Sequence, residues 1–159
     1  MRNKLLKDIN AYLDSVRGRI SVRESLPRFY KKFIGLDETE RFIVVNNLSE
    51  TDNDAARLLL ERVLVSDKNI VVRHEAAFSL GCIGDHGSRI ALRHAVFTDK
   101  SVLVRHEAVM ALSEIGTEED LEVLDQGLND ENAEVVLTCK IARKRLTARL
   151  NNLQEALSP

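Results

Sequence analysis

Apolar side chains recur every three or four positions along most of this chain, which is the spacing of one face of an α-helix. Residues 70–84 and 102–116 each contain Val-Arg-His-Glu-Ala followed by Leu, Ile and Gly at matching positions, 32 residues apart. A third, degenerate copy without His-Glu starts near Ala133, and a weaker copy precedes the pair around residues 40–60. Recurrence at this period predicts stacked structural repeats.

Capping residues mark the ends of the first helix in each unit. Asp99 or Ser101 can cap the start of one such helix. Gly84 and Gly116 are expected to end the first helices in the left-handed conformation, which glycine adopts without a steric penalty. Each unit is therefore predicted to turn back on itself after its glycine.

A second helix is expected after each glycine, over residues 89–96 in one unit and 121–124 in the next. Asp67 and Asp130 fall at the matching turns between units. Units of two antiparallel helices resemble the short HEAT-like repeats. The predicted fold is therefore all-α: a HEAT-like α-solenoid of stacked helix pairs with an N-terminal helical extension.

The repeat divides the chain into three predicted parts. Residues 1–36 form a basic helical extension, residues 37–150 the HEAT-like repeat domain, and residues 151–159 a C-terminal tail. The extension carries an apolar stripe that can either cap the solenoid or pair with a second chain. The stripe consists of Leu5, Leu6, Ile9, Leu13 and Val16; Pro27 can open a second short helix, and Gly18 and Gly35 are plausible breaks.

Charge is distributed unevenly although the net charge of the 159 residues is only −2. Residues 1–35 contain nine Lys or Arg and three Asp or Glu, so a basic segment precedes an acidic body. Such a segment could meet a partner subunit, a membrane headgroup or a polyanion, or form an ordinary solvated helix face. The balanced total makes nucleic acid an unlikely partner of the chain as a whole.

The two cysteines, Cys82 and Cys139, lie far apart and in no metal-binding spacing. Both fall in apolar helical patterns, where a free cysteine is expected to behave as a small buried hydrophobe. No apolar run is long enough to span a membrane, and no signal-peptide pattern is present. The simplest expectation is a reducing, cytoplasmic location.

The repeated His-Glu pair is the strongest chemical feature of the sequence. His74 and Glu75 recur as His106 and Glu107, one repeat later. A carboxylate near a helix–helix contact costs several kcal/mol if it is dry and unpaired. Translation by one repeat brings His74 beside His106, because adjacent first helices lie roughly 10 Å apart. All four residues are candidate metal ligands. The alternative is that they are ordinary solvent-exposed side chains without a function, which is what we expect of His86 and His94.

Within one pair, the two side chains point about 100° apart on a helix, so each pair suits two ions better than one. Two His and two Glu are also few ligands for one chain. A two-fold dimer would supply four of each, enough for two ions with a mixed nitrogen and oxygen shell. Imidazole and carboxylate with open positions favour non-heme Fe(II), with Mn or Zn as alternatives.

These motifs resemble deoxyhypusine hydroxylase. The resemblance rests on Val-Arg-His-Glu-Ala and Leu-Gly-x-Ile-Gly at 72–84, on their copy at 104–116, and on Glu134 to Ala142, and covers roughly residues 40–147. It implies a HEAT-like di-iron monooxygenase built from two similar halves, each with two His-Glu motifs. This chain has only two such motifs and therefore looks like one half.

The resemblance implies a homodimer with two irons per dimer and dioxygen as co-substrate. His74 and His106 would bind one iron together with Glu75 of the partner subunit. Glu107 would lie in the outer shell or face the substrate, which makes it the candidate catalytic residue. Two alternatives are a non-enzymatic scaffold that binds a protein partner and a di-iron oxygen carrier or sensor. The substrate, the metal used in the cell and the role of the basic extension stay open.

Overall fold

The computed structural model describes residues 22–50 and 54–157, which are helical and contain no strand. Eight α-helices and one 3-10 turn follow one another within these ranges. Their bounds are α2 Val22–Phe33, α3 Glu38–Leu48, α4 Asp54–Ser66, α5 Ile70–Ile83, η1 His86–Ser88, α6 Arg89–Thr98, α7 Val102–Ile115, α8 Glu118–Gly127 and α9 Ala133–Leu157.

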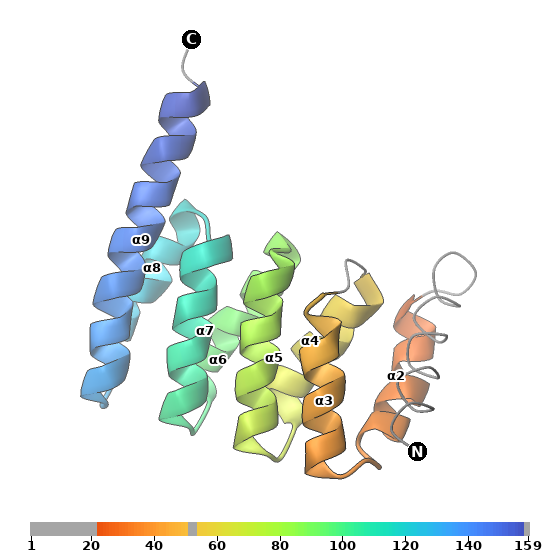
Figure 1. The fold of residues 1–159 in the computed structure, drawn as a ribbon. Coiled ribbons are helices and arrows are strands. Elements are labelled where there is room, and N and C mark those ends of the chain that lie inside the picture. Colours follow the sequence, from red (N-terminus) through yellow and green to blue (C-terminus); the bar gives the residue numbers. More distant parts are fainter. Residues whose placement is uncertain (1–21, 51–53, 158–159) are drawn as a thin grey trace.

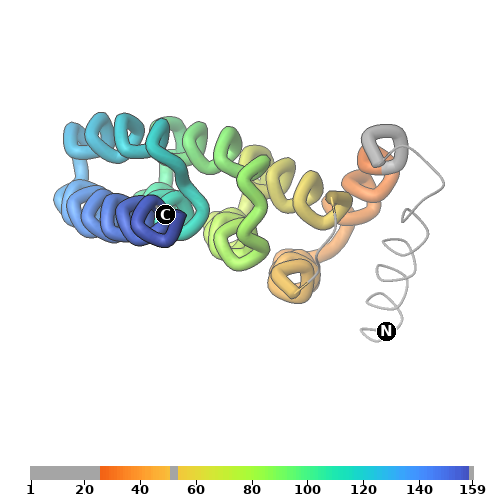
Figure 2. The backbone as a smooth tube through the Cα atoms, turned by 90° about the horizontal axis from the view of Figure 1, so that it is seen from above, coloured from red at the N-terminus to blue at the C-terminus, as the bar shows by residue number. Residues whose placement is uncertain are grey.

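The helices form two layers. Helices α3, α5, α7 and α9 stand side by side as the first helices of successive units, with α4, α6 and α8 behind them (Figure 1). The view from above shows the two layers edge-on (Figure 2). Helix α5 packs on α3 and α7, and α7 packs on α9. The prediction of an all-α solenoid is confirmed.

Small residues allow α5 and α7 to approach closely. Ala76, Ala77, Ala108 and Ala111 are buried along this contact. A Cβ atom at Gly81 would lie 3.1 Å from the Cβ of Ala111, which is tighter than ordinary van der Waals contact. The close approach brings the two His-Glu motifs onto neighbouring helices.

The ends of α5 and α7 differ although their sequences match. Gly84 has φ of 74° and ends α5 in the predicted left-handed conformation. The same expectation is wrong for Gly116, whose φ is −67°. Glycine is favoured at position 116 because any larger residue would place a Cβ atom against the Leu112 carbonyl oxygen. Ser101 is the N-cap of α7 without a side-chain bond, and its N–H donates to Asp99 Oδ1 at 2.8 Å.

The N-terminal prediction is corrected in part. Pro27 does not open a helix but lies inside α2, which begins at Val22. Pro27 is the sixth residue of α2, past the four N–H groups that have no helical acceptor, so the helix lacks one backbone hydrogen bond there. The apolar stripe over residues 5–16 and the glycine at 18 lie outside the described residues. The three-part division stays a prediction; α9 continues without a break from residue 150 to Leu157.

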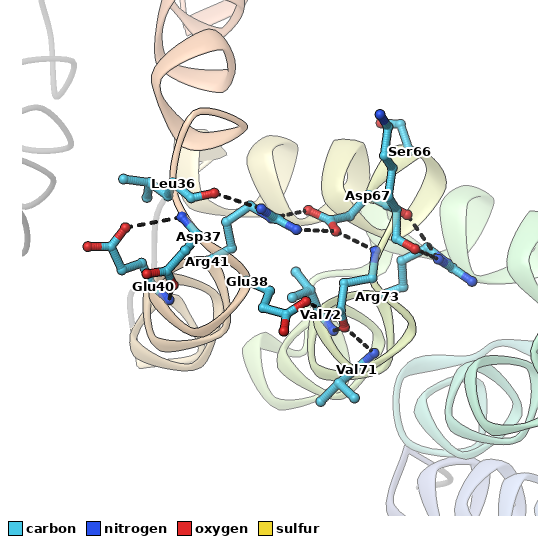
Figure 3. Close-up of polar contacts among 12 residues, drawn as sticks. Leu36, Asp37, Glu38, Glu40, Arg41, Ser66, Asp67, Val71, Val72 and Arg73 are labelled. Atoms are coloured by element: carbon cyan, nitrogen blue, oxygen red, sulfur yellow. Dashed lines mark hydrogen bonds and ion pairs between the residues drawn. The ribbon is translucent and has the colours of Figure 1, made fainter.

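An arginine–aspartate pair recurs in three successive units, at the start of α3, α5 and α7. Arg41 Nε lies 2.8 Å from Asp67 Oδ2, and Arg41 Nη1 donates to the Leu36 carbonyl (Figure 3). Arg73 forms the same contacts with Asp99 and with the Asp67 carbonyl. Arg105 repeats them with Asp130 and the Asp99 carbonyl. We call these three pairs the arginine–aspartate ladder.

Candidate metal centre

The first His-Glu motif lies on α5 and the second on α7, at the same height in adjacent units. His74 Nε2 lies 3.3 Å from Glu107 Oε2. The two side chains are 26% and 16% exposed, so the contact is accessible from outside. The imidazole of one repeat therefore meets the carboxylate of the next, and not the glutamate beside it in sequence.

Glu75 makes its contact in the other direction, toward α3. Its Oε1 accepts a hydrogen bond of 2.8 Å from Asn46 Nδ2. Glu75 is only 8% exposed, so this amide provides a hydrogen bond for an otherwise buried carboxylate. Asn46 thus fixes the orientation of Glu75 from the preceding unit.

His106 faces the following unit. Its Nδ1 lies 2.8 Å from Thr138 Oγ1 on α9, and that hydroxyl also donates to the Glu134 carbonyl at 2.7 Å. Thr138 is buried and His106 half-buried. The second imidazole is therefore held through a hydroxyl, whereas the first meets a carboxylate.

A shallow groove of about 370 Å³ runs beside Glu107 between α5 and α7. Phe78, Cys82 and Met110 contribute to its lining. Cys82 is exposed, so the expectation that it is buried is wrong, whereas Cys139 is buried as expected. Partial desolvation of its sulfur by the surrounding protein raises the pKa of the Cys82 thiol, and the negative charges of Glu107 and Glu75 raise it further. Of the two carboxylates, Glu107 itself lines the groove.

The donor atoms at this site are of types that bind metal ions, but only two of them are in contact. Imidazole nitrogen and carboxylate oxygen are donors that suit first-row transition ions, and His74 and Glu107 bring one of each together. Among the residues that the structure describes, no three His, Cys, Asp or Glu side chains are gathered as a metal site. The approach of His74 to His106 stays a prediction, and the contact that the structure shows between the two motifs is the one between His74 and Glu107.

Sequence reasoning missed two residues of the site. Thr138 lies one repeat length after His106, so the repeat register could have identified it as the next member of that row. Asn46 lies 29 residues before Glu75, outside the register, and carried no such signal. His86, expected to be an ordinary loop residue, forms a hydrogen bond within the protein: its Nδ1 lies 2.8 Å from the Ile115 carbonyl oxygen.

Comparison with known proteins defines the family. A model of HEAT repeats matches residues 37–138, which is more than half of the chain. The chain therefore belongs to the HEAT-repeat family, as the paired helices and the ladder indicate. Among curated protein sequences, none matches significantly. None of the helices described here is long and apolar enough to cross a membrane.

Among solved structures, the chain is similar to human deoxyhypusine hydroxylase, determined in complex with glycerol. The sequences are 25% identical, and the TM-score is 0.64. The match covers 80% of this chain and 42% of that chain, so this protein spans less than half the length of the hydroxylase. The sequence-based resemblance to that enzyme is thereby confirmed at the level of the fold.

Proposed function

We propose that this protein is a two-fold homodimer that holds two non-heme iron ions and activates dioxygen, as a hydroxylase related to deoxyhypusine hydroxylase. The observation that carries the proposal is the contact between His74 Nε2 and Glu107 Oε2, which joins the two copies of the motif across adjacent helices. One chain offers too few donors for two ions, and a second copy doubles them.

Each motif residue has a distinct role in the proposed centre. His74 and His106 would hold one iron together with the partner subunit's Glu75, and ferrous iron bound there would supply redox chemistry toward dioxygen. Glu107, at the edge of the groove, faces the substrate and can accept a proton there. Asn46 orients the Glu75 carboxylate through its amide, so that this side chain loses less conformational freedom when it binds the metal.

Exposed apolar side chains on the motif face support a second chain as the missing partner. Val71 and Phe78 are three and four positions from His74, and Leu103 is three positions from His106, so they share its helix face. They are 52%, 45% and 47% exposed. An apolar surface around polar ligands is typical of an interface that excludes water.

The decisive experiment measures native mass and iron content together. We expect a dimer carrying about one iron per chain after anaerobic loading with Fe²⁺. His74→Ala and His106→Ala should each lose iron and keep the helical circular dichroism spectrum. His94→Ala is the matched control, because His94 is an exposed histidine on α6, in the other layer. Full iron content in both motif variants would refute the assignment of ligands.

The same measurement separates the alternatives. A metal-free monomer would overturn the di-iron proposal and favour a scaffold that uses the apolar motif face for a protein partner. An iron-loaded dimer that binds dioxygen reversibly, without product, would instead favour an oxygen carrier or sensor. Turnover of a substrate with consumption of dioxygen supports the hydroxylase.

A further inference from the structure

The positions equivalent to the histidines form a row across the first helices. Phe42, His74, His106 and Thr138 follow one another at intervals of one repeat, on α3, α5, α7 and α9. Thr138 therefore occupies the histidine position of the degenerate third copy. Its side chain does not turn to solvent but contacts the histidine of the preceding repeat.

The bonds of the Thr138 hydroxyl determine which nitrogen of His106 carries hydrogen. The hydroxyl has one hydrogen, and it is directed to the Glu134 carbonyl, which can only accept. Toward His106, Thr138 Oγ1 must then act as the acceptor, so Nδ1 is the N–H donor. A neutral imidazole has one N–H, which leaves the lone pair on Nε2.

We propose that Thr138 is a positioning residue that holds His106 in the Nδ1–H tautomer and presents its Nε2 to the metal. The inference rests on the proposed iron centre, in which Nε2 of His106 would be the atom that binds the metal. Histidine ligands in general donate their second ring nitrogen to a fixed acceptor, which orients the ring and raises its basicity. Thr138 would provide that acceptor from a unit that has itself lost the His-Glu pair.

The test compares Thr138→Val with Thr138→Ser and Thr147→Val in the full chain. Valine has the shape of threonine without the acceptor, and serine restores the acceptor. Thr147 is the matched control, because it lies on the same helix and its buried hydroxyl has no hydrogen-bond partner among the described residues.

The first readout needs no metal. Nitrogen-15 NMR of the metal-free protein at about pH 8.5, where imidazoles are observed in the neutral form, reports the tautomer of each histidine. We expect Nδ1–H for His106 in the wild type, Thr138→Ser and Thr147→Val, and a shift toward Nε2–H in Thr138→Val. An unchanged His106 tautomer in Thr138→Val would overturn the proposal.

The second readout is the affinity for Fe²⁺ alone, titrated under argon. Thr138→Val should bind about 10- to 100-fold more weakly than the wild type, and the other two variants within a few-fold of it. Equal affinity in Thr138→Val would overturn the positioning role. A wild type that binds no Fe²⁺ would refute the iron centre itself, and the tautomer measurement would still decide what Thr138 does to His106.

Discussion

The arginine–aspartate ladder and the His-Glu motifs are both repeated in sequence, but only the ladder repeats in its contacts. Arg41, Arg73 and Arg105 each bind an aspartate 25 or 26 residues later with nearly the same geometry. His74 meets a carboxylate, whereas His106 meets a hydroxyl. The ladder pairs join the start of a first helix to the turn at the end of its unit, while the motif contacts cross to a neighbouring unit on either side. The two histidines therefore make different contacts, because the unit after His74 offers a glutamate and the unit after His106 offers a threonine.

The largest expected loss of stability comes from placing a glutamate in the third repeat copy, which lacks the His-Glu pair. Cys139 occupies the glutamate position of the third copy and is fully buried. A Cβ at Gly127 would lie 2.5 Å from its Sγ, so no space remains on that side. Cys139→Glu should cost at least about 4 kcal/mol of unfolding free energy, because the carboxylate is dry and unpaired. Urea unfolding followed by circular dichroism measures it.

The reverse substitution serves as the control for that experiment. Glu107→Cys, at the equivalent position one repeat earlier, should cost less unfolding free energy than Cys139→Glu, because it removes a carboxylate from a partly exposed position and does not bury one. Cys139→Ala tests whether the site accepts a smaller side chain and still folds. Similar losses in Cys139→Glu and Glu107→Cys would mean that the two positions are equivalent after all.

The next prediction tests whether the pairs of the arginine–aspartate ladder contribute equally to stability. Arg105→Met removes the guanidinium from a pair in which both side chains are largely buried and leaves Asp130 unpaired. The expected cost is about 3 kcal/mol. Arg73→Met should cost nearly the same, since Arg73 and Asp99 have matching contacts and burial. Denaturation midpoints that differ widely between the two variants would contradict the equivalence of the ladder.

Much of this fold was predictable because the repeat is a local pattern. The pairing of helices, the turn aspartates and the left-handed Gly84 all follow from residues within one repeat length of each other. Gly116 was mispredicted because its requirement is steric: beyond the Leu112 carbonyl, its Cβ would press on Asp120 and Leu146, which arrive from later helices. Sequence alone does not show which long-range neighbour crowds a backbone.

The candidate site was predictable in its members but not in its contacts. The register identified His74, Glu75, His106 and Glu107, and the expectation that the two histidines face each other followed from ideal translation. The structure adds a contact that this translation did not predict, between His74 and the Glu107 carboxylate of the neighbouring helix. Side-chain direction across a helix contact depends on the packing of both helices. The sequence of one helix alone does not show how the two helices pack.

The smallest predicted effect concerns acid, and it sharpens the electrostatic account of the ladder. Burial opposes ionisation of Asp130, but hydrogen bonds from Arg105 and from the Asn132 N–H outweigh it, so the pKa of this carboxyl is lowered. A carboxyl with a lower pKa in the folded than in the unfolded state stabilises the fold above the unfolded value, about 4. That contribution is lost as the pH falls through the folded-state pKa. Unfolding free energies of the wild type and Asp130→Asn should therefore differ clearly at neutral pH and converge under acid. A difference independent of pH would show that Asp130 acts through its hydrogen bonds and not through its charge.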